Sequence, residues 1–197
     1  MTRGAIAVVA AIVVGGCGGG NEGQKRVFAS ADTARIATVR PVMPGWTWPQ
    51  NPEKHLSSGS KTGAPSTDPF DVELRRQTAD VVSLGDAANH WRDMHKLANL
   101  YVQVLASAAE AHKLMAPFNA YSRGLGDKFG HEEVDGLGDE AWLLRAVGNG
   151  PEVTYHWRRG NLVVEAHLQC FGVSPADVGA ATRAWVDAID DATREGT

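Results

Sequence analysis

The sequence predicts an α+β domain, with an antiparallel sheet and two main helices packed on one face, preceded by a signal peptide and a flexible tether. Two runs of alternating residues, 153–158 and 162–171, flank Gly160-Asn161. Glycine in the first position of a two-residue loop is typical of a type II′ hairpin turn. Residues 97–106 also alternate apolar and polar side chains with the period of a strand. These strands, together with two capped amphipathic segments, predict the class.

The remaining elements follow from local patterns and turn residues. In chain order we expect a strand over 34–42, a flexible loop over 53–69, a short helix over 71–79, an antiparallel strand pair over 81–91 and 97–106, a helix that kinks at Pro117, a strand over 141–147, the hairpin, and a final helix.

Both main helices are expected to begin at a serine cap. Ser107 precedes Glu110 by three residues, as in a capping box. Ser174 precedes Pro175, and proline at the first helical position loses no hydrogen bond. The final helix should bury Trp185 as its largest anchor.

A short internal similarity suggests a repeat. Residues 90–92 and 156–158 both read His-Trp-Arg, and each is followed by a strand that begins near an Asn-Leu pair. If the similarity is real, the domain consists of two β-β-α units. Both helices would then pack on the same side of the sheet.

The N-terminal residues predict an export signal. Arg3 is followed by an apolar run from Ala5 to Val14, and Gly15-Gly16 precede Cys17. Ten apolar residues are too few for a transmembrane helix, which needs about 20. We therefore expect a signal peptide over 1–16, a lipidated cysteine and flexible tether over 17–33, and a single extracytoplasmic domain over 34–197.

This arrangement resembles the signal peptide and lipobox of bacterial lipoproteins. The resemblance implies cleavage before Cys17, acylation of its thiol with a palmitate-type lipid, and attachment to the extracytoplasmic face of the cell membrane. The membrane is then a partner through the lipid anchor. Two acyl chains hold a protein firmly, at about 0.8 kcal/mol for each buried CH₂.

Charge and cysteine content restrict the other partners. Without residues 1–16 the chain keeps 18 basic and 23 acidic side chains, a formal charge of −5. A mildly acidic chain argues against a nucleic-acid partner. If Cys17 is acylated, Cys170 has no disulfide partner in the chain, and its apolar surroundings predict a buried thiol.

The second hairpin supplies a candidate metal site. Its register places His156 opposite Glu165 and His167 opposite Thr154, so two imidazoles and a carboxylate share one face. These side chains could bind a zinc-type ion. The alternative is a solvated polar face, and no fourth ligand is evident. We therefore assign no cofactor.

Two glycine-rich acidic segments, 124–127 and 136–139, both read Gly-Leu-Gly-Asp. They could hold calcium or form acidic surface loops. Residues 136–141, running into a strand, also resemble a segment of small secreted actinobacterial lipoproteins and sensor-like extracellular domains of unknown function. That resemblance implies an extracytoplasmic binding or sensing role.

Trp46 and Trp48 lie between prolines and are candidate ligand-binding residues, because rigid aromatic side chains can stack on sugars or peptides. The alternative is that they pack on the domain's own core. No G-x-S-x-G, P-loop or H-E-x-x-H motif is present, so no catalytic residue is assigned.

The sequence therefore favours a lipid-anchored binding or sensing protein of the cell envelope, whose partner is an envelope component or a protein. The alternatives are a metal-dependent hydrolase using His156, Glu165 and His167, and a structural envelope lipoprotein.

Overall fold

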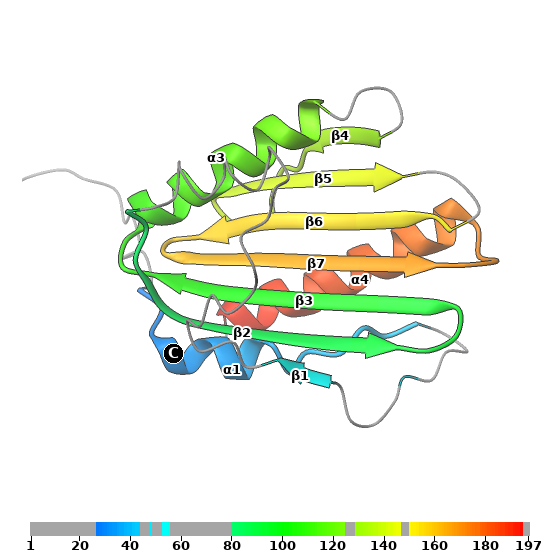
Figure 1. Cartoon of the computed structure of the whole chain (residues 1–197), viewed down its shortest axis with the longest axis horizontal. Coiled ribbons are helices and arrows are strands. Elements are labelled where there is room, and N and C mark those ends of the chain that lie inside the picture. Colours follow the sequence, from blue (N-terminus) through cyan, green and yellow to red (C-terminus); the bar gives the residue numbers. More distant parts are fainter. Residues whose placement is uncertain are drawn as a thin grey trace, which may run out of the picture.

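A computed structural model of the chain describes residues 27–43, 48, 53–55, 80–124, 129–146 and 150–194. Its centre is an antiparallel sheet with the strand order β1-β2-β3-β7-β6-β5-β4 (Figure 1). The α+β class with an antiparallel sheet is confirmed. The strands are β1 (Glu53–His55), β2 (Ser83–Arg92), β3 (Lys96–Leu105), β4 (Phe129–Glu133), β5 (Glu140–Ala146), β6 (Glu152–Arg159) and β7 (Leu162–Cys170); the helices are α1 (Ser30–Ile36), α3 (Ala108–Gly124) and α4 (Pro175–Arg194).

The β6–β7 hairpin forms as predicted. Trp157 pairs with Val164 and Tyr155 with Ala166 across it. Gly160 has φ +58°, and every described residue with a positive φ is a glycine, so Asn161 has a negative φ. A positive φ followed by a negative φ distinguishes a type II′ turn from type I′.

The two central strands of the sheet, β3 and β7, are far apart in sequence. β2 and β3 form the predicted antiparallel pair, and β3 then pairs with β7 from Lys96–Cys170 to Val104–Leu162. The other hairpin strand, β6, continues the sheet to β5 and β4. The four strands β2, β3, β7 and β6 therefore lie side by side.

The two long helices lie on opposite faces of the sheet, whereas the sequence predicted both on one face. Helix α4 packs Trp185 and Ile189 on the alternate β7 residues that include Val164, and runs behind the sheet in Figure 1. Helix α3 packs Met115 against Val163, which points the other way because strand residues alternate. We call these surfaces the α4 face and the α3 face.

The sequence pattern did not distinguish the faces because the α3 face is also apolar at one end of the β3–β7 pair, where helix α3 covers it. Leu105 and Val163 on the α3 face are as buried as their neighbours on the α4 face. This arrangement also argues against the predicted repeat. Two β-β-α units related by a two-fold axis between antiparallel β3 and β7 would carry their helices on the same face.

The folded part begins earlier than predicted, and its first element is a helix. Residues 30–36 form α1 where a strand over 34–42 was expected, because the Asp32 carboxylate accepts the Ala29 N–H and caps the first turn. Phe28 is 1% exposed and belongs to the core, although residues up to 33 were predicted as tether. Similarly, β1 occupies the start of the predicted loop over 53–69.

Both serine caps are present. Ser107 Oγ accepts the Glu110 N–H at 3.2 Å, and Ser174 Oγ accepts the Asp177 N–H at 3.1 Å. Helix α3 continues through Pro117 without a second start.

No helix in the described ranges is long and apolar enough to cross a membrane. The predictions for residues 1–26, Trp46, most of loop 53–69 and the helix over 71–79 lie outside the described residues.

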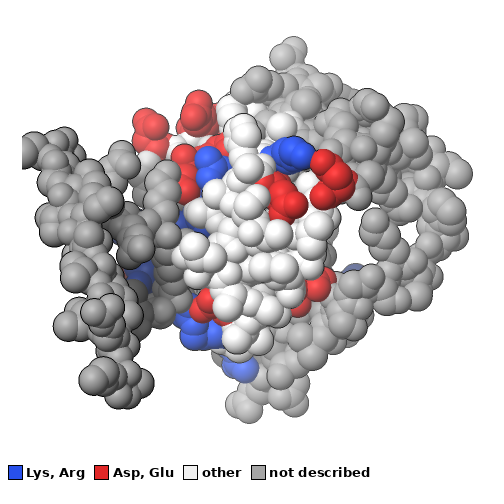
Figure 2. Space-filling view, turned by 90° about the vertical axis from the view of Figure 1, so that its left-hand side faces the viewer, with Lys and Arg blue, Asp and Glu red and all other residues white. Residues whose placement is uncertain are grey.

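Figure 2 looks onto the end of the molecule where α1 begins, α4 ends and the β6–β7 turn lies. Basic and acidic side chains there surround an area without charged side chains. No charge of one sign dominates this end in the view.

Candidate binding site

The α3 face has an apolar part and a polar part. Helix α3 covers the apolar part with Ala111 and Met115. Beyond it, the strands present polar side chains where a core would be apolar. We call this region the polar patch; its members are His90, Asn99, Tyr101, Glu152, Thr154, His156, Glu165 and His167.

A row of polar contacts crosses four strands within the patch. His90 Nδ1 lies 2.7 Å from Asn99 Oδ1, and Asn99 Nδ2 lies 3.0 Å from His167 Nδ1. His167 Nε2 lies 3.2 Å from Glu152 Oε1. An amide oxygen accepts and an amide nitrogen donates, so His90 donates from Nδ1 and His167 accepts at Nδ1. The proton of a neutral His167 is then on Nε2, the nitrogen near Glu152, and the proximity of His167 lowers the pKa of that carboxyl.

Glu165 occupies the next row of the patch. The register places it opposite Tyr101 on β3 and His156 on β6. Within the described residues, its carboxylate forms no hydrogen bond or ion pair. Burial raises the pKa of Glu165, and the nearby His167 offsets this effect only in part.

The two residues opposite Glu165 also have shifted pKa values. Burial lowers the pKa of His156 to about 4, so the ring is neutral near pH 7. Burial, followed by the Glu165 charge, raises the pKa of Tyr101. Titratable groups with shifted pKa values that cluster on one surface are a physical indicator of a functional site.

The hairpin register predicted from the sequence is confirmed, with His156 opposite Glu165 and His167 opposite Thr154. The confirmed register does not by itself test whether these side chains bind a metal ion. In the described parts of the chain, no group of three or more His, Cys, Asp or Glu side chains is placed to hold a metal ion. Because His167 contacts Asn99 and Glu152 instead, the metal role of these residues stays a prediction.

Sequence reasoning missed His90, Asn99, Tyr101 and Glu152. The first two face each other across the predicted β2–β3 pair, so fixing the register of that hairpin would have found them. The contact between Asn99 and His167 was not accessible in this way, because no local pattern predicts that β3 pairs with β7.

Trp48 lies away from the polar patch. It is partly buried against the core of the α4 face, and Lys96 Nζ lies 5.6 Å from its ring centroid. Self-packing was the alternative interpretation of this residue. The structure does not bring Trp48 together with His156, Glu165 and His167.

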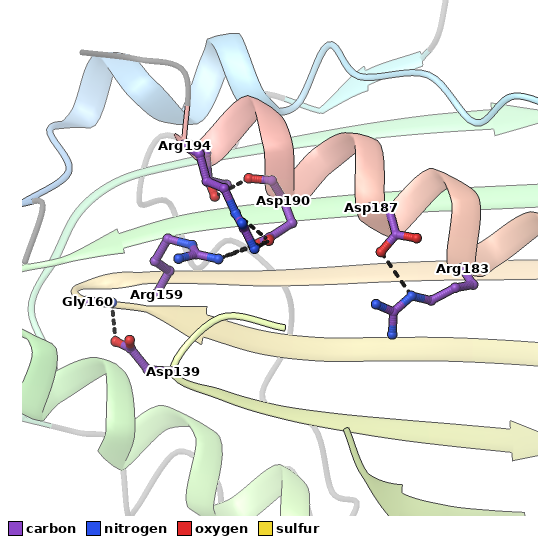
Figure 3. A network of polar contacts seen from close by, with 8 residues as sticks. Asp139, Arg159, Gly160, Arg183, Asp187, Asp190 and Arg194 are labelled. Atoms are coloured by element: carbon purple, nitrogen blue, oxygen red, sulfur yellow. Dashed lines mark hydrogen bonds and ion pairs between the residues drawn. The ribbon is translucent and has the colours of Figure 1, made fainter. Parts of the chain in front are cut away.

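The second Gly-Leu-Gly-Asp segment closes over the hairpin turn. Asp139 Oδ2 accepts the Gly160 N–H at 2.7 Å (Figure 3). The same oxygen lies 3.3 Å from Arg158 Nη1. Gly138 has φ +62°, and a Cβ there would lie 2.3 Å from the Arg158 carbonyl oxygen. These contacts show a structural role for the segment in holding the turn.

Cys170 is fully buried, as predicted. Burial raises the pKa of its thiol to about 12, so the thiolate is scarce at neutral pH. Its environment is that of a small apolar side chain.

No family model matches the chain, and no curated protein matches it. Among solved structures, it is similar to the extracellular domain of PknH from Mycobacterium tuberculosis. The two share 12% sequence identity with a TM-score of 0.47, over 85% of this chain and 100% of that domain. Similarity at this level establishes neither a common fold nor a common function.

Proposed function

We propose that the chain is a lipid-anchored protein of the extracytoplasmic face of a cell membrane, with a non-catalytic binding or sensing role at the envelope. The binding site in this proposal is the polar patch. The observation that carries it is the cluster of Glu165, His156 and Tyr101, three buried or half-buried groups with shifted pKa values on one sheet surface.

The anchor is supported by the lipobox-like residues that end at Cys17. The end of the molecule where α1 begins carries charges of both signs (Figure 2), so it offers little electrostatic attraction to anionic lipid. Attachment would therefore depend on acyl chains, which need no basic surface.

Cysteine substitutions in the full chain test the anchor. Cys17→Ser should abolish incorporation of labelled palmitate and leave the signal peptide uncleaved, which mass spectrometry detects. Cys170→Ala is the matched control, because the buried Cys170 thiol is a poor nucleophile and its loss should leave labelling unchanged. Palmitate labelling that persists in Cys17→Ser would contradict the anchor.

Retention on purified cell-envelope fragments tests the binding site. Asn99→Ala breaks the row of polar contacts at its centre and should reduce retention. Trp48→Ala changes the other candidate surface and should have a smaller effect, because Trp48 packs on the α4-face core. Circular dichroism checks folding. If only the tryptophan variant loses retention, the polar patch is the wrong surface.

A further inference from the structure

We infer that the polar patch binds the ammonium group of a small organic cation, with Glu165 as its anionic partner and Tyr101 as its aromatic wall. This inference rests on the proposed function and names the ligand class of the same site. Three features support this inference: Glu165 has no ionic partner among the described residues, the charged groups of the patch favour a cation, and Tyr101 is exposed.

Glu165 differs from the other inward-facing carboxylates of the sheet. Glu140 accepts from Arg158 at 2.9 Å, and Glu152 contacts His167 at 3.2 Å. Glu165 has no such partner among the described residues. A partly buried carboxylate without a partner is incompletely hydrated, and a ligand cation would supply the missing charge.

The patch contains two carboxylates and no lysine or arginine. Its carboxylates are Glu152 and Glu165, and its other titratable groups are histidines and Tyr101. Two arginines flank the patch on the same face. Arg158 beside Glu165 is bound to Glu140 and Asp139, whereas Arg92 lies beyond His90 at the far end of the patch and is exposed. Charge complementarity therefore favours a cation and disfavours an anion.

Tyr101 supplies an aromatic surface beside the carboxylate. Its side chain is 42% exposed, although its strand is central in the sheet, and it lies directly opposite Glu165. The His90 ring meets it edge to face at 5.3 Å and fixes its position. An ammonium group next to a carboxylate and over a tyrosine face gains from both interactions.

The same arrangement disfavours a metal ion. Metal binding at a protein site needs several convergent donors, and the described side chains include no group of three that could provide them. An ammonium group needs only one carboxylate and an aromatic face, which Glu165 and Tyr101 provide.

Calorimetry with the full chain in nonionic detergent tests the inference, with choline as the probe and its neutral carbon isostere dimethylbutanol as the comparison. We expect choline to bind and dimethylbutanol to bind at least about tenfold more weakly. Glu165→Gln should weaken choline binding at least about tenfold, and Tyr101→Leu several-fold. Glu133→Gln removes an exposed carboxylate at the far edge of the same face and should change nothing.

Equal binding of choline and dimethylbutanol would overturn the inference, as would unchanged choline binding in Glu165→Gln. Zinc binding that depends on Glu165 would also overturn it, in favour of the predicted metal site. If Glu165→Gln loses envelope retention but choline never binds, the site stands and the ligand class is wrong. If Glu165→Gln changes neither envelope retention nor choline binding, both the inference and the proposed site are wrong.

Discussion

The imidazole of His156 is buried in the sheet, and burial lowers its pKa to about 4 from the usual 6.5. Between these values the unfolded chain binds more protons than the folded one, so stability falls as the pH drops from about 6.5 toward 4. The loss attributable to this residue is about 3 kcal/mol. His156→Gln should lose less stability over this range, measured by urea unfolding at both pH values. His95→Gln, at an exposed position, is the control and should behave like the wild type.

Glu165 makes the opposite contribution. Its pKa is raised by burial, so between the unfolded and the folded pKa the folded chain binds more protons than the unfolded chain. Stability is then lost as the pH rises from the unfolded pKa through the folded one. Glu165→Gln should therefore be more stable than the wild type at about pH 7 and equally stable at about pH 4, measured by thermal unfolding. A variant less stable at pH 7 would show that Glu165 has an ionic partner.

A variant that is more stable and binds less well is expected of a functional residue that carries a cost in the free protein. In that case the two measurements on Glu165→Gln, stability and choline binding, change in opposite directions. If the carboxylate had a purely structural role, the substitution would lower both stability and choline binding.

At the scale of elements, local signals were sufficient for the hairpins and for both long helices. Gly160 set the β6–β7 turn, and the two serine caps marked where α3 and α4 begin. The prediction for residues 34–42 was wrong because a short apolar run fits a strand or a helix, and the cap from Asp32 decided between them. The choice of face for α3 and the pairing of β3 with β7 depend on long-range packing, which no local pattern contains.

Helix α4 is held to β6 by an ion pair whose carboxylate is buried. Asp190 accepts from Arg159 at 2.6 Å and from Arg194, and its side chain is only 5% exposed (Figure 3). Asp190→Ala should cost about 2–3 kcal/mol, because it removes charged hydrogen bonds to Arg159 and Arg194. Chemical denaturation measures this cost.

The same helix contains a matched control in Asp187. It pairs with Arg183 at 2.9 Å, but both side chains are largely exposed. Asp187→Ala should cost less than about 0.5 kcal/mol, because water screens exposed pairs. Equal costs for the two substitutions would show that Asp190 does not hold the helix to the sheet.

At the scale of the whole molecule, the polar patch exists only because two hairpins meet. His156, Glu165 and His167 come from the β6–β7 hairpin, and their relative positions were predictable. Asn99 and Tyr101 reach them through the β3–β7 pairing. Sequence reasoning could therefore find the residues of one hairpin only. The residues that complete the patch come from the other hairpin, and only the β3–β7 pairing shows that they lie beside the first set.

Asn161 connects three distant parts of the chain at the end of the sheet. Its side chain accepts from the Phe28 N–H at 2.8 Å and donates to the carbonyl oxygens of Phe28 and Leu105 at 3.0 and 2.8 Å. Because these groups are buried, Asn161→Ala should cost about 3 kcal/mol and should speed amide hydrogen exchange in α1 more than in β5. Arg35→Ala removes another link between α1 and the body, an exposed bond to the Ala192 carbonyl, and should cost much less. If α1 exchanged no faster in Asn161→Ala than in Arg35→Ala, the first helix would be held by its apolar contacts, with Phe28 and Ile36 as the anchors.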